Sequence, residues 1–323
     1  MKKYNVPVFI PHNGCPNDCV FCNQKKITGV QTEVTPSDAA HIIEKYLSFL
    51  PKDNRYVEIA FFGGSFTGLS LELQEEFLKT AYKYREQTDG IRMSTRPDYI
   101  NDDVLSLAKK YNVRTIELGL QSSNDNVLIK NNRGHRFSGT VAAAGLIKAY
   151  DIDLGLQMMI GMYGSSPEID LKTAYDTAAL SPKCVRIYPT LTLSGTKLEE
   201  YYKSGKYVPY DLNTAISVTD KIMRVFEEQN IEIIRVGLHS DESLTSGSIV
   251  AGPYHPAFRE LVLCRRQRDK IERDIIEHNI HDCVYTLNVP RQKESEVIGH
   301  KRCNARYFKE KYNIDLKTTP DFF

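Results

Sequence analysis

The chain has 323 residues, 41% of them apolar and 26% charged, which suits one large folded domain with a small appendage and excludes a disordered or fibrous protein. A formal net charge of +1 excludes a chain that is basic throughout, so any nucleic-acid binding must come from a local surface. No apolar run is long enough to span a membrane, and seven cysteines without a signal peptide predict a protein of the reducing cytoplasm.

Strand-like and helix-like segments alternate from the N-terminus to about residue 188. Apolar and β-branched runs predict six strands, at residues 6–11, 57–62, 91–95, 115–120, 154–160 and 185–188. Helical periodicity predicts five helices between them, at residues 37–50, 71–85, 102–111, 138–150 and 168–180. Such alternation gives a parallel sheet with right-handed crossovers. We therefore expect an α/β fold, a partial (βα)6 barrel of the TIM type that is open on one side.

The pattern changes after residue 188. Helices at residues 196–204 and 212–229 precede a strand at 231–236, and a Gly- and Ser-rich loop, a basic helix and a separate tail follow. The chain is thus predicted to contain the partial barrel in residues 1–240, the loop and basic helix in 241–282, and a small α+β module in 283–323.

Three cysteines stand close together just after the first predicted strand. Cys15, Cys19 and Cys22 have the spacing C-x3-C-x2-C, within a loop at residues 13–29. In a barrel this loop lies at the C-terminal end of the first strand, where active sites form. Three thiolates can hold a [4Fe–4S] cluster and leave one iron open to a ligand. The alternatives are a zinc site completed by His12 and a chance group of structural cysteines.

The triplet, with the aromatic Phe21 before its last cysteine, resembles that of the radical S-adenosylmethionine (SAM) superfamily. Four segments resemble the radical SAM half of the Elp3 family, the catalytic subunit of Elongator: FFGGSFTG at 61–68, STRPDYI at 94–100, ELGLQSSNDNVLIKNNRGH at 117–135, and VRIYPTLTLSGTKLEEYYKSGKYVPY at 185–210. The resemblance spans residues 6–210. It implies an enzyme whose [4Fe–4S] cluster cleaves SAM reductively to a 5′-deoxyadenosyl radical, with a base in tRNA or rRNA as the expected target. A one-electron donor such as flavodoxin or ferredoxin is implied as a partner.

The resemblance also assigns residues to SAM. Gly63 and Gly64 are expected to contact its amino group, Gln121 and Gln157 its ribose, and Arg133 its carboxylate, as a guanidinium fork suits a carboxylate. Phe21 is expected beside the cofactor. Weaker candidates for the substrate side of the site complete the set: Arg96, Tyr188 and His255.

Two departures from known families matter for the substrate. Elp3 proteins carry an acetyltransferase domain after the radical SAM part, and this chain is expected to lack one. The segment FIPHNGCPNDCVFC also resembles the anaerobic coproporphyrinogen oxidases, but their further cysteine is Gln24 here. Two alternative functions stay open: a radical SAM enzyme acting on a small molecule such as a porphyrinogen, and a non-catalytic iron–sulfur or zinc RNA-binding protein.

The tail resembles the core of a KH module, in which a glycine loop joins two helices and clamps single-stranded nucleic acid. The candidate loop is 299–302, without the second glycine of the usual pattern, and Lys301 and Arg302 are its predicted RNA contacts. Residues 284–323 hold eight basic and five acidic side chains, a local charge of +3. The preceding helix adds Arg265, Arg266 and Arg268. A module that serves only for docking is the alternative.

Three further cysteines are spaced about 20 residues apart, at Cys264, Cys283 and Cys303. They could hold an auxiliary cluster, although ordinary free cysteines are the more common case.

Overall fold

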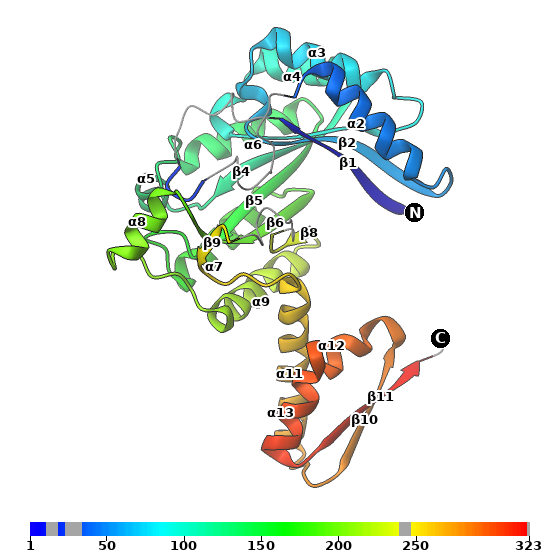
Figure 1. Ribbon diagram of the computed structural model, residues 1–323, viewed down its shortest axis with the longest axis vertical. Coiled ribbons are helices and arrows are strands. Elements are labelled where there is room, and N and C mark those ends of the chain that lie inside the picture. The colour runs from blue at the N-terminus through cyan, green and yellow to red at the C-terminus, as the bar shows by residue number, and fades with distance from the viewer. Residues whose placement is uncertain (11–18, 23–33, 239–246, 322–323) are drawn as a thin grey trace.

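The computed structural model describes residues 1–10, 19–22, 34–238 and 247–321 (Figure 1). Seven strands form one sheet in the order β1-β2-β3-β4-β5-β6-β8, and every neighbouring pair is parallel. The sheet curls into a half-barrel. Its strands are β1 (Lys2–Ile10), β2 (Arg55–Gly63), β3 (Gly90–Thr95), β4 (Val113–Gln121), β5 (Asp153–Ile160), β6 (Cys184–Pro189) and β8 (Glu232–Val236).

Helices cover the convex face of the sheet (Figure 1). Side chains that alternate along each strand point into this layer and form the main core, among them Val8, Phe61, Leu118 and Met158. Polar N-caps fix where the helices begin, as Thr35 does by accepting a hydrogen bond from the amide of Asp38. The helices are α2 (Pro36–Phe49), α3 (Leu71–Tyr82), α4 (Asp102–Lys110), α6 (Phe137–Ala149), α7 (Pro167–Ala179) and α9 (Leu212–Glu228).

The α/β half-barrel is confirmed, with one correction. The strand predicted at 231–236 is β8, a seventh parallel strand beside β6, so the sheet is larger than six units. The sequence hid this because two helices, α8 (Lys197–Lys203) and α9, separate β6 from β8. A short antiparallel pair, β7 (Thr192–Leu193) with β9 (Ile249–Ala251), was not predicted, since two or three residues carry no period.

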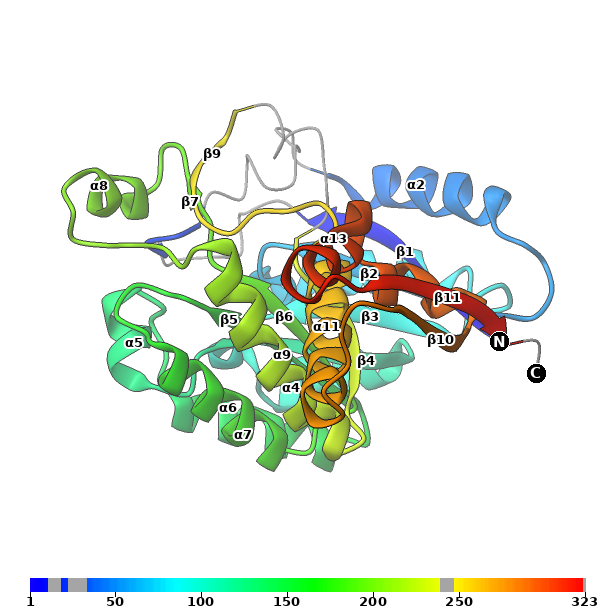
Figure 2. The ribbon, with the colours of Figure 1, turned by 90° about the horizontal axis from the view of Figure 1, so that it is seen from below.

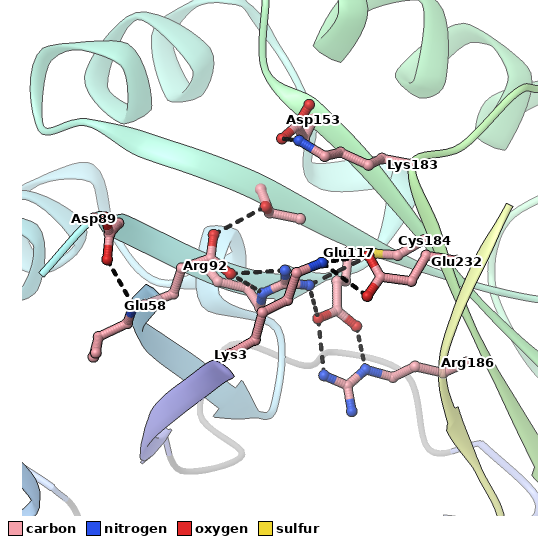
Figure 3. Close-up of polar contacts among 12 residues, drawn as sticks. Lys3, Glu58, Asp89, Arg92, Glu117, Asp153, Lys183, Cys184, Arg186 and Glu232 are labelled. Carbon is pink, nitrogen blue, oxygen red and sulfur yellow. Dashed lines mark hydrogen bonds and ion pairs between the residues drawn. The ribbon is translucent and has the colours of Figure 1, made fainter. Parts of the chain in front are cut away.

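The concave face of the sheet is polar, and its charges are paired (Figure 3). Arg92 of β3 donates to Glu58 of β2 at 2.8 Å and to Glu117 of β4 at 2.8 Å. Arg186 of β6 donates to both carboxylate oxygens of Glu117. Gln157 of β5 donates its Nε2 to the same carboxylate at 3.2 Å. One carboxylate therefore connects four neighbouring strands from inside.

Glu117 is only 1% exposed, and burial alone would raise its pKa. The charges and hydrogen bonds of Arg186 and Arg92 outweigh burial and hold the pKa of Glu117 below its usual value. Glu117 is therefore ionised at neutral pH, and the two guanidiniums depend on it for their compensation. At the rim of the same sheet, Lys3 and Glu232 pair at 2.7 Å between the two edge strands, both exposed to solvent.

The helix α11 (Phe258–Glu277) belongs to both parts of the molecule (Figures 1 and 2). Phe258 and Val262, near its start, are buried in the core of the sheet domain. Ile271 and Ile275, near its end, are buried in a second core with Phe308. None of the helices in the described parts of the chain is long and apolar enough to cross a membrane.

The C-terminal module is a strand–helix–helix–strand unit packed on α11. Its two strands pair in parallel, and a glycine turn joins its two helices. Asn304 holds this turn by donating to the carbonyls of Cys264 and Val297, at 2.8 and 3.1 Å. The elements are β10 (Val284–Pro290), η4 (Arg291–Lys293), α12 (Glu294–Ile298), η5 (His300–Arg302), α13 (Cys303–Tyr312) and β11 (Asp315–Asp321).

Replacing Glu117 with Gln should destabilise the sheet domain by about 3–5 kcal/mol, because two mostly buried guanidiniums would lose their shared carboxylate. Urea unfolding of Glu117→Gln against the wild type measures this. The matched control is Glu232→Gln, which breaks an exposed pair and should cost about 0.2–1 kcal/mol. Equal losses in the two variants would contradict the role given to Glu117.

Replacing Gly299 with Ala should cost about 1–3 kcal/mol or more. Gly299 has φ 86° and ψ 152°, a region that essentially only glycine occupies. An added Cβ would also lie 2.6 Å from the sulfur of Cys303 and 2.7 Å from the amide of Asn304. The control, Gly145→Ala within α6, meets no atom within 4 Å and should be neutral or stabilising by about 0.5–1 kcal/mol. Thermal unfolding of both variants checks the difference in sign.

Candidate functional site

Two glycines end β2 at the mouth of the half-barrel. Gly63 has φ 105°, and a Cβ there would lie 2.6 Å from the carbonyl oxygen of Ile10 on β1. The amide of Gly64 donates to that same oxygen at 3.2 Å. The backbone thus requires glycine at 63, and both glycines are half-buried at the end of β2.

Gln121 and Arg133 meet at the end of β4. Gln121 has a left-handed φ of 65°, and its buried Oε1 has no hydrogen-bond partner among the described residues. Arg133 is 6% exposed and donates to the carbonyl of Gly119 at 2.8 Å. It also donates to the sulfur of Cys19 at 3.3 Å. The structure therefore brings Gln121, Arg133 and one predicted cluster cysteine together.

Gln157 of β5 and Tyr188 of β6 belong to the concave face, on the two strands that follow β4 in the sheet. Gln157 donates Nε2 to Ser94 at 3.2 Å as well as to Glu117. A carboxylate only accepts hydrogen bonds, so the amide nitrogen of Gln157 must face Glu117, and its carbonyl oxygen must face away from it. Arg186 donates to the hydroxyl of Tyr188 at 3.4 Å.

Arg96 holds the backbone of Arg133 through a hydrogen bond. It forms a bidentate pair with Asp98 at 2.9 and 2.8 Å and donates to the carbonyl of Arg133 at 2.5 Å. His135 lies nearby, and burial, followed by the charge of Arg133, lowers its pKa to about 4. His135 is therefore neutral at physiological pH and adds no charge beside the two arginines.

The described part of the cysteine loop, residues 19–22, is fixed from two sides. The amide of Val20 donates to the carbonyl of Asn131 at 3.2 Å, and the amide of Leu198 donates to the carbonyl of Val20 at 2.9 Å. Phe21 packs partly buried against the apolar cluster around Val20 and Leu198. Cys19 is buried and Cys22 half-buried. Cys15, His12 and Gln24 lie outside the described residues.

His255 and the C-terminal residues lie apart from this group. The His255 ring packs edge-on against His300 with centroids 5.2 Å apart, which places it in the contact between the sheet domain and the glycine turn. Lys301 and Arg302 are exposed on that turn, and both have left-handed φ values. No ion pair joins either of them to a described residue.

The arginines of α11 are engaged within the protein. Arg266 pairs with Asp220 and with Glu227 of α9, Arg265 with Asp269, and Arg268 lies over the ring of Tyr307. Arg266 joins α11 to α9, Arg268 joins α11 to α13, and Arg265 is paired within α11, so the number of arginines overstates the charge open to a ligand. Among the described residues no three His, Cys, Asp or Glu side chains are placed to hold a metal. The auxiliary cluster at Cys264, Cys283 and Cys303 therefore has no support.

Residue-by-residue reading of the sequence missed Glu117, although it lies in the segment ELGLQ. Its signal was present: an acidic residue alternates with apolar ones within a strand buried on both faces. An arginine likewise interrupts each of β3 and β6, at 92 and 186. Opposite charges at inward positions of neighbouring strands indicate a paired interior.

Comparison with known proteins gives the same outline. The Radical SAM superfamily model matches residues 9–175, more than half of the chain, and the Radical_SAM C-terminal domain model matches 182–268. A tRNA uridine(34) acetyltransferase of Dehalococcoides mccartyi is 24% identical over 282 residues, covering 72% of this chain and 60% of that protein. Elongator complex protein 3 of Homo sapiens is 26% identical over 335 residues, covering 86% and 59%.

Solved structures share the fold. Elp3 of Methanocaldococcus infernus, with an N-terminal deletion, superposes with a TM-score of 0.65 at 24% identity, over 84% of this chain and 64% of that one. Coproporphyrinogen III oxidase of Escherichia coli superposes at 0.50 and 18% identity, over 71% and 53%. The chain spans only about three fifths of the length of several curated relatives. By its sequence match over more than half its length, the chain belongs to the radical SAM superfamily, as an enzyme related to Elp3 and the tRNA uridine-modifying enzymes.

Proposed function

We propose that the protein binds a [4Fe–4S] cluster through Cys15, Cys19 and Cys22, binds SAM at the mouth of the half-barrel, and acts on a base in tRNA or rRNA. When bound, the cluster supplies the electron that cleaves SAM to methionine and a 5′-deoxyadenosyl radical. The observation that carries the proposal is the hydrogen bond from Arg133 to Cys19, with Gln121 beside Arg133 at the end of a parallel sheet.

The residues at the mouth fit SAM in chemical terms. Gln121 has a buried acceptor without a partner among the described residues, which a ribose hydroxyl would satisfy. Gly63 brings bare backbone to the surface, where an amino group can approach carbonyls closely. Arg133 provides a cation held in place by Arg96, and it suits a carboxylate. Because Glu117 binds the amide nitrogen of Gln157, the side-chain carbonyl oxygen of Gln157 can accept from a second ribose hydroxyl.

The RNA part of the proposal is supported by relatives and by the C-terminal turn. The similar curated proteins include three whose names state an action on tRNA uridine(34). Lys301 and Arg302 stand exposed on a turn between two helices, in the arrangement expected of a KH-like loop. A low-potential donor such as flavodoxin or ferredoxin would supply the electrons.

Anaerobic reconstitution tests the chemistry. With dithionite and SAM, the reconstituted protein should release 5′-deoxyadenosine and hold about four irons per chain. Replacing Cys15, Cys19 and Cys22 with Ala together should remove both the iron and the product. The control triple variant, Cys264→Ala, Cys283→Ala and Cys303→Ala, should keep both. If the wild-type protein is loaded with iron but yields no 5′-deoxyadenosine, the proposal that it cleaves SAM is contradicted.

Charge reversal on the glycine turn tests the RNA contacts. Lys301→Glu with Arg302→Glu should weaken binding of a tRNA transcript by at least 10-fold at low salt, because two phosphate partners become repulsive. The control reverses two exposed lysines of the convex face, Lys45→Glu and Lys79→Glu, and should bind within two-fold of the wild type. Equal affinity of all three proteins would show that the turn does not contact RNA.

A further inference from the structure

Two tyrosines and two lysines form a surface beside the cysteine loop, here named the Lys–Tyr rim: Lys130, Tyr163, Tyr201 and Lys206. Lys130 ends the short helix α5 (Asp125–Lys130), Tyr163 follows β5, Tyr201 lies on α8, and Lys206 follows α8. Both helices lie at the end of the sheet where β5 and β6 end (Figures 1 and 2). Lys130, Tyr201 and Lys206 lie within segments that resemble the Elp3 family, whereas Tyr163 lies outside them. Neither the proposed SAM site nor the C-terminal turn uses any of the four.

The two rings pack against each other at a tilt, and lysine ammoniums lie beside them. The centroids of Tyr163 and Tyr201 are 5.0 Å apart with a tilt of 49°. The ammonium of Lys206 lies 4.2 Å from the Tyr201 centroid and 5.5 Å from that of Tyr163. The ammonium of Lys130 lies 5.9 Å from the Tyr163 centroid. Both rings are half-buried, so each keeps some surface open to a ligand.

The charge of the rim is not neutralised by the described residues around it. On α8, in contrast, Lys197 pairs with Glu200 and Lys203 pairs with Glu199, so these two lysines are neutralised. Lys130 and Lys206 are exposed, and neither forms an ion pair within the described part of the chain. Two positive charges and two aromatic rings therefore remain available for an anionic, π-bearing partner.

The rim is attached directly to the loop that carries Cys19 and Cys22. Asn131, next to Lys130, donates to the carbonyl of Tyr163 at 2.8 Å and accepts from the amide of Val20. Leu198 of α8 donates to the carbonyl of Val20, and Phe21 packs in one apolar cluster with Tyr163 and Tyr201. A ligand on the rim is therefore held at the edge of the proposed reaction centre.

We propose that the Lys–Tyr rim binds a single-stranded stretch of RNA next to the reaction centre. An unpaired base stacks on the tyrosine pair, and the ammoniums of Lys130 and Lys206, on flexible stems, move from the rings to the flanking phosphates. An acidic peptide would use the cations but leave the ring faces without a partner. This inference rests on the proposed function, in which RNA is the substrate.

Binding by the full-length reconstituted protein tests the inference, with fluorescently labelled oligouridine and a tRNA transcript as the probes. Lys130→Ala with Lys206→Ala should weaken oligouridine binding at least five-fold and reduce the salt slope of log K by about 1.4, as loss of two phosphate contacts on a single strand predicts. Tyr201→Leu, which keeps an apolar side chain but removes the ring, should weaken binding about 10-fold. Iron content shows that each variant remains folded and loaded.

The matched control removes the same charge elsewhere: Lys45→Ala with Lys79→Ala, on α2 and α3 of the convex face, should stay within two-fold of the wild type. If the wild type binds RNA and the rim variants bind it equally well, RNA binding by the Lys–Tyr rim is contradicted, while the proposed function stands. If the wild type cleaves SAM but binds neither probe, the RNA substrate and the rim both fail.

Discussion

The pairing of charges inside the half-barrel is the constraint on which the site depends. A radical SAM site needs a concave face that can hold polar ligands, so this face cannot be filled with apolar side chains as in a closed barrel. Charges placed there must be compensated, because an unpaired buried charge is strongly destabilising. Glu117 meets this need by accepting from Arg92, Arg186 and Gln157 on three other strands.

The same carboxylate sets the direction of a neighbouring amide. Because Glu117 can only accept hydrogen bonds, it fixes the nitrogen of Gln157 toward itself and leaves the carbonyl oxygen for another donor. On the mouth side, Arg96 holds the backbone of Arg133 while Arg133 reaches Cys19. Interior pairing and the residues at the mouth are thus parts of one connected polar structure.

Much of this architecture could be predicted from the sequence, and the limits have physical causes. Strand and helix periodicity located the first six strands, since runs such as IAFF and IELGL must be buried. It did not reveal that β8 joins the sheet, because pairing partners across two helices leave no local pattern. Family-like motifs pointed to Gln121 and Arg133, whose binding of SAM stays a prediction. No spacing rule indicates that Glu117 would pair with Arg92 and Arg186, which are distant in sequence.

The C-terminal module shows why composition is a weak guide to a binding surface. The arginines of α11 raise the local positive charge. Arg266, however, forms ion pairs with Asp220 and Glu227 of α9 and so connects α11 to the sheet domain. Lys301 and Arg302, on the turn, are by contrast exposed and form no ion pair with a described residue. That turn is held against the sheet domain by His300, which contacts His255 and lies 3.4 Å from Glu260. Because α11 contributes to both cores, packing rather than a flexible linker sets how the turn is oriented toward the half-barrel.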